Sequence, residues 1–134
     1  LCSAGEARNY YRWTSPQATD QTYSVYVTYK LPTTFKEFND ANTIKLSAYT
    51  TSTTLASASL QVLRKNVAGG SISSCGAATT INSSATTWQQ TDFGGDETAC
   101  GFAGGDYVIF KINVTAKSNA SVYIENLDFT FNNR

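Results

Sequence analysis

Alternation of apolar and polar side chains near the end of the chain is the feature that most limits the fold. Between Asp106 and Thr115 the apolar residues of one parity are Val108, Phe110, Ile112 and Val114. Side chains alternate faces along a β-strand, so these residues form one continuous apolar face. A small polar turn over 116–121 leads into a second alternating segment. The two segments predict a β-hairpin whose apolar face needs a second sheet to cover it.

The second segment changes parity within itself. Its apolar residues are first Val122 and Ile124, and then Leu127, Phe129 and Phe131. One extra residue in a strand turns every later side chain to the opposite face. We therefore predict a β-bulge at Glu125–Asn126.

Alternation over 22–31, 44–48 and 58–62 predicts further strands, with the Ser/Thr segment 50–54 as a hairpin connection. We expect the odd-numbered apolar residues of 23–31 to form the half of the core that faces Val108–Val114. Phe35 and Phe38 would plug one end of the domain from a single helical turn.

Seven or eight strands without helical periodicity predict an all-β fold, an antiparallel β-sandwich. A jelly roll suits the pattern best, because its long strands would lie in the middle of the sheets. An immunoglobulin-like order remains open. Residues 21–134 form this single domain, whereas residues 1–20 lack clean alternation and form an N-terminal arm.

The chain has three cysteines, and two of them lie in Gly-rich loop sequence. We predict a disulfide between Cys75 and Cys100, closing a loop of roughly 25 residues and contributing about 3 kcal/mol. The alternative is two free loop thiols. Cys2 is left over and could pair with another subunit or with an upstream part of a precursor. The chain contains no Met, so we expect a processed product or a fragment.

A disulfide implies an oxidising compartment, and we expect an extracellular or cell-surface protein. Three Asn-x-Ser/Thr sequons agree with this, at Asn82, Asn113 and Asn119. In a chain so rich in Asn, Ser and Thr, several sequons also arise by chance. No apolar run approaches the roughly 20 residues of a membrane-spanning helix.

The absence of histidine argues against catalysis. It removes Ser-His-Asp and Cys-His mechanisms and most zinc catalysis. No nucleophile elbow, phosphate loop or dinucleotide fingerprint occurs. Ten basic and ten acidic residues cancel without a run of either sign, so no basic stripe for nucleic acid exists. We expect a protein that is not an enzyme and does not bind nucleic acid.

Four acids lie close in sequence with glycines between them: Asp92, Asp96, Glu97 and Asp106. Carboxylates on flexible loops suit calcium, which is the one cofactor that we consider. The segment matches no calcium-loop motif. The alternative is a set of solvated turn acids.

Several aromatic residues could form a stacking platform beneath sugar rings. The principal candidates are Trp13, Tyr26, Tyr49 and Trp88, and the wider set adds Tyr10, Tyr11 and Tyr123. Tyr26 and Tyr49 both lie outside the apolar parity of their strands. The alternative for each of these residues, above all for Trp13 and Trp88, is a place in the core.

The order of motifs resembles jelly-roll carbohydrate-binding modules and modules of extracellular fibres. The resemblance rests on Gln21–Tyr29, on Gly105–Val114 and on the closing segment Val122–Phe129. The closing segment is similar to the last strand of many such binding modules, with Glu125 where they often have aspartate. No loop motif allows calcium or sugar ligands to be transferred from those families.

Two functions from different classes follow. The first is an extracellular structural module, a subunit of a surface filament or pilus or a fibre head. It would self-associate as a homo-oligomer or filament and mediate adhesion, with the arm adding a strand to a neighbouring subunit. The second is a non-catalytic carbohydrate-binding module.

Overall fold

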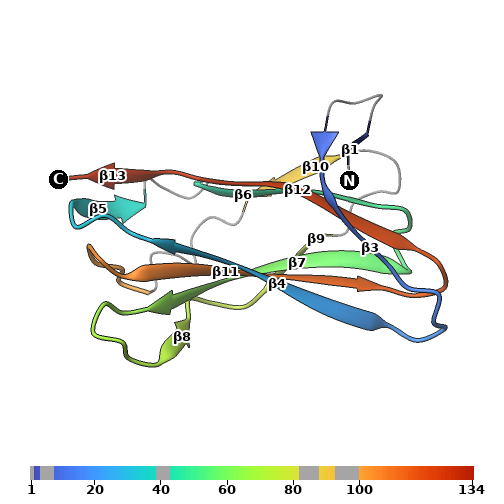
Figure 1. The fold of residues 1–134 in the computed structure, drawn as a ribbon, viewed down its shortest axis with the longest axis horizontal. Helices are drawn as coiled ribbons and strands as arrows, with labels where there is room; N and C mark the ends of the chain where they lie inside the picture. The colour runs from blue at the N-terminus through green and yellow to red at the C-terminus, as the bar shows by residue number, and fades with distance from the viewer. Residues whose placement is uncertain (1, 4–7, 39–42, 82–87, 93–99) are drawn as a thin grey trace.

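Two antiparallel β-sheets face each other in the computed structural model of the chain, which describes residues 2–3, 8–38, 43–81, 88–92 and 100–134 (Figure 1). The described residues contain no helix, and therefore none long and apolar enough to cross a membrane. The predicted all-β class is confirmed.

The lower sheet of Figure 1 is built around two long central strands, and we call it the β7–β11 sheet. Its strands in spatial order are β4 (Gln21–Lys30), β11 (Tyr107–Ala116), β7 (Ala56–Lys65) and β8 (Ile72–Ser74), with β9 (Thr79–Ile81) also paired to β7. The register is continuous over ten residues between β11 and β4 and between β11 and β7.

The upper sheet, which we call the β6–β12 sheet, has a short strand at each edge. Its strands in spatial order are β10 (Gln89–Asp92), β6 (Ile44–Thr50), β12 (Ser121–Phe129) and β3 (Tyr11–Thr14). The order β3–β12–β6–β10 facing β4–β11–β7–β8 is that of a jelly roll, as predicted. Two small ribbons complete the fold: β1 (Cys2–Ser3) with β2 (Arg8–Asn9), and β5 (Phe35–Phe38) with β13 (Phe131–Asn133).

Part of the predicted N-terminal arm belongs to the domain. Residues 11–14 form β3, which pairs with Ser121–Ile124 of the same chain. Addition of the arm to a neighbouring subunit stays a prediction.

The bulge predicted at Glu125–Asn126 is confirmed. The register of β12 against β6 shifts between Ile124, opposite Ala48, and Leu127, opposite Leu46. Ile124 is 5% exposed, and Leu127 packs against the same core after the shift. The extra residue thus keeps both halves of β12 in contact with the core.

The predicted closing hairpin is wrong. β11 lies in one sheet and β12 in the other, so the turn between them crosses the sandwich. The predicted hairpin over 50–54 is wrong for the same reason, because β6 and β7 also lie in different sheets. Alternation identifies an apolar face, but the same pattern suits strands that pair edge to edge and strands that face each other across a core.

The expected opposition of 23–31 and 108–114 is also wrong. β4 and β11 are neighbours in one sheet, with Val25 beside Ile112 and Val27 beside Phe110. Their apolar faces therefore lie side by side and share a partner, the inner face of the β6–β12 sheet. Phe110, with no exposed side-chain surface, lies in the centre of this core.

Phe35 and Phe38 are buried as predicted, but β5 is a strand and not a helical turn. Their ring centres lie 5.3 Å apart. β13 pairs with β5 and satisfies backbone groups that a helical turn would have satisfied internally.

Candidate functional site

The outer face of the β6–β12 sheet, directed away from the β7–β11 sheet, carries the candidate site. β6 alternates between fully buried and partly exposed side chains along its whole length. The partly exposed set is Lys45, Ser47 and Tyr49. Tyr123 of β12 lies opposite Tyr49, and Arg12 of β3 lies opposite Tyr123. Strand pairing therefore aligns these outward side chains in one row.

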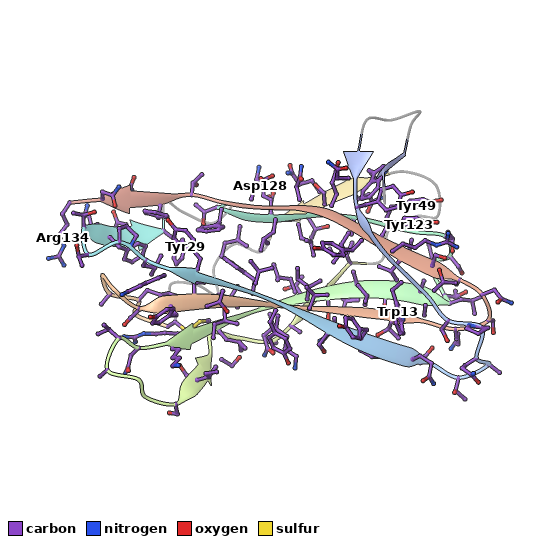
Figure 2. All side chains as sticks on the ribbon, viewed as in Figure 1. Trp13, Tyr29, Tyr49, Tyr123, Asp128 and Arg134 are labelled. Atoms are coloured by element: carbon purple, nitrogen blue, oxygen red, sulfur yellow. A yellow bond between two sulfur atoms is a disulfide. The ribbon has the colours of Figure 1, made fainter. Side chains whose placement is uncertain are left out.

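Four partly exposed rings gather on this face, and we call them the aromatic patch: Tyr10, Tyr49, Trp88 and Tyr123. The ring centre of Tyr123 lies 5.1 Å from those of Tyr10 and Tyr49. The Trp88 ring centre lies 6.0 Å from the same two rings. Figure 2 shows Tyr49 and Tyr123 beside each other toward one end of the sheet.

Arg12 borders the aromatic patch. Its guanidinium carbon lies 5.8 Å from the ring centre of Tyr123, within cation–π range. Its Nε donates a hydrogen bond to Thr14 Oγ1 at 3.0 Å, which fixes the plane of the group. Arg12 thus adds a positively charged donor to the rim of an otherwise aromatic surface.

Polar side chains continue the same face away from the rings, and we call them the polar row: Lys45, Gln90, Asp92 and Asp128. In register, Lys45 lies between Asp92 on β10 and Asp128 on β12. Lys45 Nζ lies 3.7 Å from an Asp92 oxygen, and Gln90 Nε2 lies 3.5 Å from Asp128 Oδ2. Asp128 lies on the outer side of β12 in Figure 2.

An open hollow of about 400 Å³ adjoins the patch at Tyr10. Its lining residues are Asn9, Tyr10, Tyr11, Glu125 and Asn126. The bulge forms one wall of this hollow, since it supplies two of the five residues. The face therefore combines a ring surface, a charged rim and a shallow recess.

This arrangement suits binding of a polyhydroxylated ligand. Aromatic rings offer apolar faces against which the C–H groups of a sugar ring can pack. Carboxylates accept hydrogen bonds, ammonium and guanidinium groups donate them, and an amide does both. Among the described residues, no group of three acids or cysteines lies close enough together to hold a metal.

The structure separates the four principal aromatic candidates. Tyr49 and Trp88 belong to the aromatic patch. Trp13 points inward, stacks on Tyr23 at 5.4 Å and donates its Nε1 hydrogen to Gln21 O at 3.3 Å. Tyr26 lies 58% exposed on the outer face of the other sheet. Trp13 and Tyr26 therefore lie outside the aromatic patch.

The four predicted calcium acids have different surroundings. Asp92 belongs to the polar row, and Asp96 and Glu97 lie outside the described residues. Asp106 is 1% exposed. Both its oxygens accept short bonds, from Arg64 Nε at 2.8 Å and from the amides of Val67 and Ala103, each at 2.9 Å. The Asp106 carboxylate therefore connects Arg64 with the loop segments at Val67 and Ala103. The calcium site stays a prediction.

The predicted disulfide between Cys75 and Cys100 is present. Cys75 is 2% exposed, and Cys100 packs against the same core. The side chain of Cys2 is not described, so its intermolecular bond stays a prediction.

The described sequons differ in access. Asn113, in the central strand β11, accepts a hydrogen bond from Ser24 Oγ at 2.7 Å. Asn119 is exposed in the turn before β12. Asn82 lies outside the described residues, and glycosylation of all three stays a prediction.

Arg12, Lys45, Gln90 and Asp128 were not among the predicted site residues. Lys45 shares the outward parity of Tyr49, which was a usable signal. Asp128 lies between Leu127 and Phe129, which were predicted to face the core, and this was a second usable signal. Arg12 and Gln90 join this face because β3 pairs with β12 and β10 pairs with β6. The alternation of side chains along the sequence does not show which strands are neighbours.

Neither a family model nor a curated protein matches the chain. Among solved structures, TmCBM61 in complex with beta-1,4-galactotriose is similar over 90% of this chain and 69% of that one, with a TM-score of 0.55 and 8% identity. A structure of infectious bursal disease virus, Gx strain, is similar over 89% of this chain and 32% of that one, with a TM-score of 0.32 and 12% identity. The likeness to TmCBM61 shows the fold: the chain is a jelly-roll β-sandwich module.

Proposed function

We propose that this chain is an extracellular, non-catalytic module that binds a carbohydrate on the outer face of its β6–β12 sheet. The observation that carries the proposal is the aromatic patch. Its rings come from four separate places in the sequence and meet on the face that the core does not use. Rings inside a sandwich are explained by the burial of apolar area in the core. A cluster of rings on the outer face is not explained in this way, and such a cluster is typical of a surface that contacts a ligand or partner.

The surroundings of the patch favour a sugar over an apolar ligand. The polar row provides donors and acceptors beside the rings, and Arg12 provides a donor on the rim. A sugar presents apolar C–H faces and hydroxyl edges at the same time, so both parts of this face would be used. The disulfide agrees with an oxidising, extracellular location.

The fold is compatible with this use, because TmCBM61 was solved with a bound oligosaccharide. Beta-1,4-galactotriose is therefore a suitable first ligand to test, followed by an array of plant, bacterial and animal glycans. The sequence identity of 8% transfers no ligand and no residue role from that protein.

We expect Tyr49→Ala and Trp88→Ala each to weaken binding of the best array ligand at least about tenfold, which corresponds to ~1.4 kcal/mol. The physical reason is loss of a ring from the centre of the contact surface. Isothermal titration calorimetry with the soluble oligosaccharide measures the intrinsic affinity. Asp128→Ala, which leaves the rings in place, tests the polar row separately.

Tyr26→Ala is the matched control, because it removes an exposed tyrosine from the opposite outer face. It should leave the affinity unchanged, and thermal melts should show that every variant is folded. An array without ligands would contradict the proposal, and so would equal losses in Tyr26→Ala and Tyr49→Ala.

A structural role as a filament, pilus or fibre subunit is the second candidate function. The observation that favours it is β4, a ten-residue strand at the edge of its sheet. Negative-stain electron microscopy of the purified chain tests the filament form directly, since filaments are visible there. The absence of filaments at high protein concentration would count against a filament or pilus subunit.

A further inference from the structure

The free edge of β4 is an unusual feature of this sandwich. β4 pairs with β11 on one side over ten residues. No strand within the described part of the chain pairs with its other side. In an antiparallel edge strand, every second residue directs its N–H and C=O groups away from the sheet. β4 therefore offers a row of backbone donors and acceptors to another strand.

The other outer strands of the two sheets are short. β3 and β10 have four residues each, and β8 has three. Short strands are one of the devices by which proteins prevent edge-to-edge association, and charges, prolines and bulges are others. β4 uses none of these along its length. It contains no proline, its register against β11 is unbroken, and its one charge is Lys30 at the end.

The side chains of β4 are also incompletely covered. Tyr23, Val27 and Tyr29 point toward the other sheet, yet they are 56%, 39% and 40% exposed. β3 pairs only with Ser121–Ile124 of β12, and its Trp13 stacks on Tyr23, near the opposite end of β4 from Tyr29. Tyr29 is in contact with Phe129 on one side, with ring centres 5.1 Å apart. An added strand would cover more of these side chains.

We propose that a second copy of this chain pairs antiparallel with β4, so that one β-sheet continues through both copies. Side-chain parity restricts the register, because inward residues must meet inward residues. With Tyr26 opposite Tyr26 of the second copy, Val25 meets Val27 and Tyr23 meets Tyr29. Thr22 then meets Lys30, so no like charges face each other. The sequence of β4 is self-complementary in this register.

This interface leaves the proposed sugar-binding face free, because the contact is along the edge of the other sheet. It is independent of the proposed sugar binding, and either proposal can fail without the other.

Light scattering after size exclusion, over a series from micromolar to millimolar protein, tests the interface. The wild-type mass should rise from one chain toward two as the concentration increases. Tyr26→Glu should raise the concentration needed for the dimer at least about tenfold, because it places two carboxylates opposite each other. Within one chain the new carboxylate would lie beside Lys111, which faces Tyr26 in register, so folding should be preserved.

Thr28→Glu is the matched control, since the same charge would meet Ser24 of the second copy and not itself. Its effect on the dimer should be smaller than that of Tyr26→Glu. A wild-type chain that stays a monomer at millimolar concentration would overturn the proposal. So would a dimer that Tyr26→Glu leaves intact, or one that both variants weaken equally.

Discussion

Asp106→Ala should lower the free energy of unfolding by about 3–5 kcal/mol, the range for removing one partner of a buried ion pair. The carboxylate is buried and accepts hydrogen bonds from Arg64 and from the amides of Val67 and Ala103. Alanine would leave the partly buried Arg64 guanidinium without its carboxylate partner, although Arg64 would still donate to Cys100 O, and it would leave two amides without acceptors. Urea denaturation followed by tryptophan fluorescence measures the change.

Asp20→Ala provides the matched control. Asp20 also pairs with a cation, with its oxygen 3.0 Å from Lys117 Nζ, but its side chain is 60% exposed. Exposed pairs contribute only about 0–1 kcal/mol, so this variant should unfold close to the wild type. Similar losses in Asp20→Ala and Asp106→Ala would show that the buried network does not stabilise the loops as described.

Removing the disulfide should have the second-largest effect. The double variant Cys75→Ala/Cys100→Ala should lose about 3 kcal/mol, because the unfolded chain regains the freedom of a loop spanning 25 residues. For a chain of this size the melting temperature should fall by roughly 10 °C. Differential scanning calorimetry of the oxidised wild type and the double variant measures the shift.

A reducing agent should lower the melting temperature of the wild type toward that of the double variant and leave the double variant unchanged. If the wild type melts at the same temperature with and without the reducing agent, while the thiols are shown to be reduced, the bond does not contribute as proposed.

The features predicted correctly from the sequence depend on local chemistry. The bulge followed from a parity change between Ile124 and Leu127, and the disulfide followed from two cysteines in loop sequence. The jelly-roll class followed from many short alternating segments. Each of these patterns is contained in one or two segments, so no knowledge of distant neighbours was needed.

The incorrect predictions concern which segments are neighbours. β11 and β12 looked like a hairpin because both have an apolar face and a short turn joins them. In the structure β4 and β7 occupy the edges of β11, whereas β3 and β6 occupy those of β12. Alternation does not distinguish these arrangements, because it records the direction of side chains and not the identity of the adjacent strand.

The candidate site was predicted only in part for the same reason. Tyr49 and Trp88 were predicted as candidate residues of an outward-facing aromatic surface. Trp13 was predicted on the same ground, its aromatic side chain, but it points inward. Only the lateral order β10–β6–β12–β3 brings Trp88, Tyr49, Tyr123 and Arg12 into one row. The polar row depends on the same lateral order, because its residues come from the three neighbouring strands β10, β6 and β12.

The bulge in β12 has a consequence for how much this strand can change. Tyr123 and Asp128 are an odd number of residues apart, so a regular strand would direct them to opposite faces. The extra residue lets one strand supply both the ring and the carboxylate to the same surface while Ile124 and Leu127 both contact the core. The number of residues between Ile124 and Leu127 is therefore fixed by the need to keep both side chains in the core. Losing one residue there would exchange the inside and outside of everything that follows.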